Sequence, residues 1–140
     1  MEPAVRHDYD WAVLRLVPDV CRGGGEPVGV VLHARRARFL GLRLRPDATA
    51  RCPGVDAALL GRFLDGLARV AAGGEGAGPI GLLPPSERFH WLTAPRSTVI
   101  QPSPVHTGRA ADPAAALDAL YEAVLGGDGT GEPGPVANAG

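Results

Sequence analysis

Side chains able to bind a ligand or take part in chemistry are concentrated in residues 86–108, a segment broken by prolines at short intervals. Arg88 and Arg96 carry guanidinium groups, which can hold a phosphate or a carboxylate through paired hydrogen bonds. His90 and His106 carry imidazoles, which can exchange a proton near neutral pH. Hydroxyl and amide groups in the same set come from Ser97, Gln101 and Ser103. These residue types predict a site for an anionic ligand or a protein partner.

A structural role is the alternative explanation for the same residues. Three prolines between residues 95 and 104 stiffen the backbone, and polar side chains beside such turns commonly bond to the neighbouring main chain. The spacing favours this role, because nothing in it fixes how the polar groups lie relative to one another. In an extended chain Arg88 and His90 share one face. We therefore expect Phe89 and Trp91, on the other face, to anchor in the core while the basic pair faces outward.

Familiar catalytic and metal-binding patterns are missing from the sequence. Neither Ser97 nor Ser103 lies in a Gly-x-Ser-x-Gly turn, and no histidine or cysteine has the spacing of a metal site. Cys21 and Cys52 are too few for a disulfide framework, and ordinary packing explains both. The sequence therefore predicts no metal ion and no cofactor.

Two functions remain open at this level. The first is a small non-catalytic binding or interaction module that uses the Arg88–His106 segment to dock a partner or an anionic ligand. The alternative is a small enzyme in which His90 or His106 acts as general base while Arg88 and Arg96 hold an anionic substrate. The enzyme requires these side chains to share one cleft, so the two functions differ in geometry.

Length and charge narrow the class of protein. A chain of 140 residues fits one domain with a core of its own. The net charge of −1 gives no electrostatic reason to expect binding to nucleic acid. No apolar run is long enough to cross a membrane, and the first residues do not resemble a signal peptide. We expect a soluble cytoplasmic protein.

Periodicity in the first third of the chain predicts strands. Residues 9–17 are apolar on both faces, which is typical of an inner strand. Residues 28–33 and 38–45 follow after short turn-forming stretches, so the three strands predict an antiparallel meander. Residues 89–93 and 97–101 are expected to add one or two strands to this sheet.

Two helices are predicted further along. Over residues 55–72 apolar side chains recur every three or four positions, and this stripe contains Val55, Leu59, Phe63, Leu67 and Val70. The second helix spans residues 114–125 and follows Asp112 as N-cap and Pro113 at the first helical position. Together the elements predict a two-layer α+β domain with a mainly antiparallel sheet packed against two helices.

The domain is expected to span residues 9–125. Residues 1–8 form an N-terminal extension in this prediction. Residues 126–140 are rich in Gly, Pro and Ala without periodicity, which is typical of a disordered tail.

Two blocks of the sequence resemble a known family. Tyr9–Pro18 (YDWAVLRLVP) and Glu87–Gly108 (ERFHWLTAPRSTVIQPSPVHTG) are similar to a bacterial family known as domain of unknown function 3037, and the resemblance runs from about Tyr9 to Leu125. The resemblance implies no reaction. It does imply an accessory role beside a kinase-like protein partner, because members of the family are often encoded next to such proteins.

Overall fold

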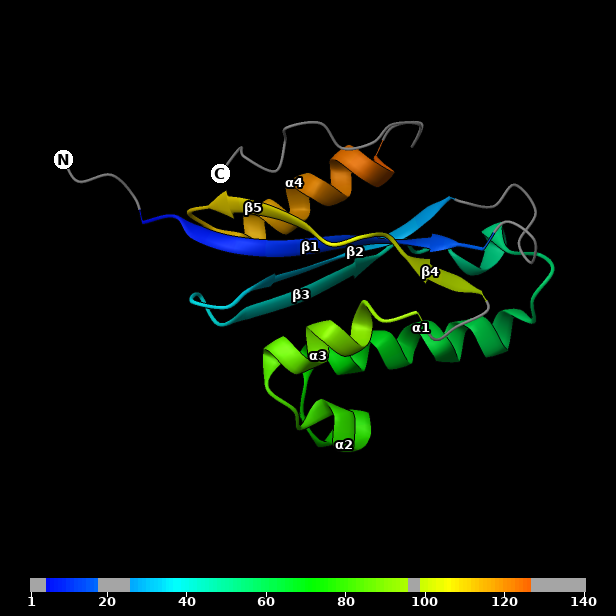
Figure 1. The fold of residues 1–140 in the computed structure, drawn as a ribbon. Helices are drawn as coiled ribbons and strands as arrows, with labels where there is room; N and C mark the ends of the chain where they lie inside the picture. Colours follow the sequence, from blue (N-terminus) through cyan, green and yellow to red (C-terminus); the bar gives the residue numbers. More distant parts are fainter. Residues whose placement is uncertain (1–4, 18–25, 96–98, 127–140) are drawn as a thin grey trace.

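The computed structural model describes residues 5–17, 26–95 and 99–126, which form a five-stranded antiparallel sheet with helices on both faces (Figure 1). The strand order is β3-β2-β1-β4, and β5 also pairs with β1. The strands are β1 His7–Leu16, β2 Pro27–Ala34, β3 Phe39–Leu44, β4 Ile100–Pro102 and β5 His106–Ala110. The three-strand meander predicted from the sequence is confirmed, and two later strands complete the sheet.

Within the described residues, four α-helices and two short 3-10 turns connect and cover the strands. The helices are α1 Ala57–Ala72, α2 Gly78–Gly81, α3 Pro85–Leu92 and α4 Pro113–Leu125, and the turns are η1 Thr49–Arg51 and η2 Glu75–Ala77. Aspartate carboxylates at Asp56 and Asp112 cap the first backbone N–H groups of α1 and α4. The α4 helix therefore begins at Pro113 as predicted, whereas α1 begins at Ala57, two residues after its predicted start.

The sheet is covered on both sides. Ala12 and Leu14 of β1 face α1 and α3, whereas Trp11 and Val13 face α4. Figure 1 shows α4 on one side of the sheet and α1, α2 and α3 on the other. The α+β class is confirmed, and the molecule has a helical layer on each face where two layers were expected. The apolar character of both faces of the central strands is the physical reason, because each face needs cover.

The largest difference from the sequence-based prediction lies at residues 89–93, which were expected to form a strand. Residues 89–92 belong to α3 instead and Thr93 is the C-cap of this helix, so Arg88 and His90 do not lie together on the outer face of an extended chain. Pro85 occupies the first helical position, where a missing N–H costs nothing, and Phe89 and Leu92, three apart, are the buried residues of the helix.

The chain ends are only partly described. β1 begins at His7, inside the predicted extension, and the predicted tail lies outside the described residues apart from Gly126. Among residues 5–17, 26–95 and 99–126, no helix is long and apolar enough to span a membrane.

Candidate functional site

Arg88, predicted as an anion clamp, is engaged by the main chain. Its Nη1 donates to the carbonyl oxygens of Val70 and Ala71, each at 2.9 Å, and its Nε donates to Leu83 O at 2.9 Å. The guanidinium thus satisfies carbonyls at the end of α1 and ties that helix to the start of α3. The chain makes room for it at Gly73, where φ is +80° and an added Cβ would lie 2.8 Å from Nη1. These bonds give Arg88 a structural role at the junction of α1 and α3.

Ser103 also bonds to the main chain. Its Oγ accepts a hydrogen bond from Val13 N at 2.9 Å and donates to Pro104 O at 2.9 Å. Together with the bond from Ser103 N to Val13 O, these contacts hold the link between β4 and β5 against β1. Gln101 lies opposite Arg15 in β4 and is exposed, while Arg96 and Ser97 lie outside the described residues.

The two histidines of the predicted site lie on opposite sides of the sheet. His106 pairs with Trp11, and their ring centroids are 4.9 Å apart on the α4 side. His90 is exposed on α3, which packs against the other face. In the described part of the chain, the sheet therefore separates His106 from His90, and the hollow that His90 lines does not include Arg88.

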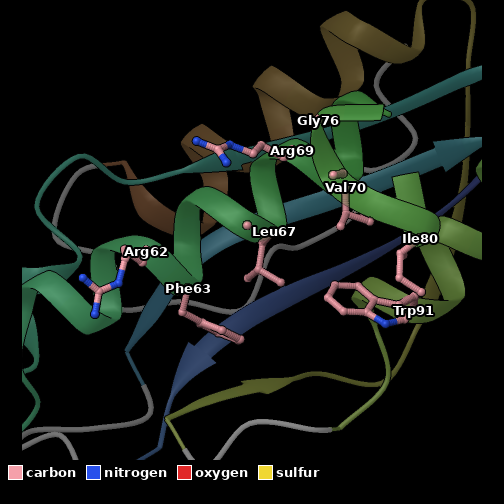
Figure 2. Close-up of a pocket in the computed structure, with 10 residues that line it drawn as sticks. Arg62, Phe63, Leu67, Arg69, Val70, Gly76, Ile80 and Trp91 are labelled. Carbon is pink, nitrogen blue, oxygen red and sulfur yellow. The ribbon is translucent and has the colours of Figure 1, made fainter. Parts of the chain in front are cut away.

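An apolar groove lies between α1, α2 and α3 (Figure 2). Its volume is about 360 Å³, and its apolar wall is made of Phe63, Leu67, Val70, Ile80 and Trp91. A smaller hollow shares Phe63, Leu67 and Trp91 and extends toward β4. The groove thus combines residues from three helices that follow one another along the chain, and Trp91 is the lining residue that comes from residues 86–108.

Two arginines stand at the rim of this groove. Arg62 and Arg69 are exposed, line the hollow, and lie seven residues apart along α1. Neither guanidinium makes a hydrogen bond or an ion pair with any described residue. The groove is therefore apolar at its wall and positively charged at its edge.

The predicted apolar stripe of α1 is confirmed at Leu67 and Val70 but not in the first half of the helix. Leu60, Leu64, Leu67, Val70 and Ala71 are the buried residues of the helix. Leu59, which was expected in the stripe, is 56% exposed, and Phe63 is half-buried in the groove. Phe63 of the predicted stripe thus lines the surface groove and packs against the edge of the core.

A second, polar hollow of about 410 Å³ lies between the N-terminal half of β1, the end of β2 and α3. The polar side chains that line it include Asp8, Asp10, His33, Arg35, Ser86 and His90. His33 is buried, and its ring stacks on Phe89 with centroids 5.5 Å apart. Burial lowers the pKa of the His33 imidazole below its ordinary value, because the charged form is poorly solvated there.

Asp8 in this polar hollow is held by a neighbour across the strands. Arg109 Nε donates to its carboxylate at 2.9 Å, and this hydrogen bond lowers the pKa of Asp8. The sequence placed His33 only at the end of a strand. The signal in the sequence is that His33, a polar residue, directly follows the apolar run Val28–Leu32 in the same strand.

Comparison with known proteins gives one family. The sequence profile described as "Protein of unknown function (DUF3037)" matches residues 11–125, which is more than half of the chain. No curated protein and no solved structure matches the chain.

Proposed function

The chain belongs to the DUF3037 family, whose description assigns no activity, and we propose that it is a non-catalytic binding module. It docks an amphipathic, acidic segment of a protein partner in the groove between α1, α2 and α3. The observation that carries this proposal is an open apolar groove whose rim holds two arginines with no partner in the described residues.

The apolar wall supports binding of apolar side chains. Phe63, Ile80 and Trp91 are each only half-buried, so a partner that covers them removes more apolar surface from water. Burial of such surface contributes about 25 cal/mol per Å². Aromatic side chains in particular anchor protein interfaces. A groove of this form accepts the apolar face of a helix.

The two arginines at the rim of the groove favour a partner with negative charge. Arg62 and Arg69 are two turns apart on α1, so their side chains leave the helix roughly 10 Å from each other along its axis. A partner helix that lies beside α1 matches them with two carboxylates that are also seven residues apart. Exposed charges of this kind set orientation and choice of partner more than affinity.

The identity of the partner rests on the family resemblance alone. That resemblance implies a kinase-like protein, and the Arg88–His106 segment contributes to its docking through Trp91 rather than through Arg88. The preferred partner region is an amphipathic acidic helix of such a protein.

A charge-swap experiment tests the proposal. The probe is a synthetic amphipathic helical peptide with leucines on one face and glutamates at two positions seven apart. A second peptide carries lysines at those two positions. We expect the acidic peptide to bind, with a change in Trp91 indole NMR signals, and the lysine peptide to bind at least about tenfold more weakly.

The variant Arg62→Glu/Arg69→Glu should reverse this preference, because it makes the rim acidic. Arg36→Glu, an exposed arginine in the turn after β2, is the matched control and should leave the preference unchanged. Equal binding of the two peptides, or no binding of either in the millimolar range, would overturn the proposal.

A further inference from the structure

His33 is an unusual residue for its position. It lies on β2, between β1 and β3, and is the only buried polar or charged side chain among the described residues. No described residue forms a hydrogen bond with its imidazole. Its ring nitrogens are not fully buried, because the one fully buried polar side-chain atom without a partner in the described residues is Trp11 Nε1. The imidazole is therefore open to a hydrogen-bond partner from outside the described chain through the polar hollow that it lines.

The polar hollow gives His33 access to such a partner. The hollow of about 410 Å³ adjoins another of about 530 Å³, and the two share Asp8, Tyr9 and Asp10. Asp10 is the cross-strand neighbour of His33 and lines the same hollow. Its carboxylate makes no hydrogen bond or ion pair with a described residue. Two acceptors, the carboxylate and a neutral imidazole, thus face one space.

The other charged groups around this hollow differ in whether they have an ion-pair partner among the described residues. Asp8 is neutralised by Arg109, whereas the Arg35 guanidinium at the edge makes no ion pair with a described residue. One unpaired carboxylate and one unpaired guanidinium therefore remain. A ligand that complements both carries a positive and a negative group of its own.

We propose that this polar hollow binds a small zwitterion with a primary ammonium and a carboxylate, the chemistry of a free α-amino acid. The ammonium donates to the Asp10 carboxylate and the His33 imidazole, and the carboxylate is held by Arg35. Phe89 lines the same space and offers an apolar contact to the ligand's side chain.

The state of His33 supports this assignment of roles. Its lowered pKa keeps the imidazole neutral near pH 7, so one ring nitrogen can accept a hydrogen bond from an ammonium group. His90 and Ser86 lie at the α3 side of the hollow and can bond to other polar groups of the ligand. The proposal is independent of the apolar groove, which has different lining residues.

NMR titration of the histidine ring signals tests the proposal. The probes are L-phenylalanine, phenethylamine, which lacks the carboxylate, and 3-phenylpropionate, which lacks the ammonium. We expect L-phenylalanine to shift the His33 and His90 signals and to leave His106, on the opposite face, unchanged. Each truncated analogue should bind at least about tenfold more weakly. Glycine, which carries both charged groups without a side chain, is titrated in parallel.

Asp10→Asn keeps the shape of the side chain and removes its charge, so it should weaken L-phenylalanine binding at least about tenfold. Asp118→Asn, an exposed aspartate on α4, is the control and should have no effect. The proposal is overturned if neither zwitterion shifts His33 in the millimolar range, if 3-phenylpropionate binds as tightly as L-phenylalanine, or if Asp10→Asn binds like the wild type.

Discussion

Replacement of Arg88 by alanine should destabilise the whole domain. The guanidinium bridges the last turn of α1 and Leu83, two residues before α3, through three hydrogen bonds of 2.9 Å. Bonds from a charged donor contribute about 1.5–3 kcal/mol each when buried, and this side chain is half-exposed. Because water can replace part of each bond at the surface, we expect a loss of about 3 kcal/mol in the free energy of unfolding.

Thermal unfolding followed by circular dichroism measures this effect. For a domain of this size, 1 kcal/mol corresponds to about 4 °C, so the midpoint of Arg88→Ala should fall by about 12 °C. Arg88→Lys keeps the charge but cannot reach the carbonyls on both sides, because its single ammonium lacks the fork geometry. We expect it to recover less than half of the loss.

Arg109→Ala is the matched control. Arg109 forms an ion pair with Asp8 in which both side chains are largely exposed, at 64% and 80%, and such pairs contribute about 0–1 kcal/mol. A midpoint for Arg88→Ala close to that of Arg109→Ala would refute the assignment of Arg88 as a structural link between α1 and α3.

Two further measurements probe buried positions. Because burial lowers the pKa of His33 below 6.5, the unfolded chain binds a proton there first, so stability should fall as pH decreases below about 6.5 and level off below the folded pKa. Urea unfolding between about pH 5 and pH 7 should show that the stability of His33→Phe lacks this part of the decrease. If the stability of the variant and of the wild type fell in parallel with pH, the assignment to His33 would be wrong. Gly29→Ala should lower the free energy of unfolding by about 2 kcal/mol, because its Cβ would lie 2.8 Å from Arg43 O. Gly61→Ala, with open space around it in α1, should raise the free energy of unfolding by about 0.5–1 kcal/mol. A destabilised Gly61→Ala or a neutral Gly29→Ala in the same unfolding series would count against this packing.

Local signals were sufficient for most elements of the fold. The strand predicted over residues 28–33 is observed as Pro27–Ala34, and the helix predicted over residues 114–125 as Pro113–Leu125. Alternation, helical spacing and an aspartate cap act within a few residues, so the chain itself carries them. The α3 helix was missed because it has eight residues and is held by tertiary packing of Phe89 and Leu92.

Sequence alone determined that residues 86–108 are a distinctive, family-specific segment, because residue types and proline spacing can be counted along the chain. Tertiary structure decided what each side chain in that segment does. Arg88 is taken up by carbonyls 17 and 18 residues earlier in the chain, and His90 and His106 are separated by the sheet. His33 acquires its significance only because Asp10, paired with it across two strands, lies beside the same hollow. Such contacts depend on register and on which face a helix covers, and neither property is encoded in the local sequence.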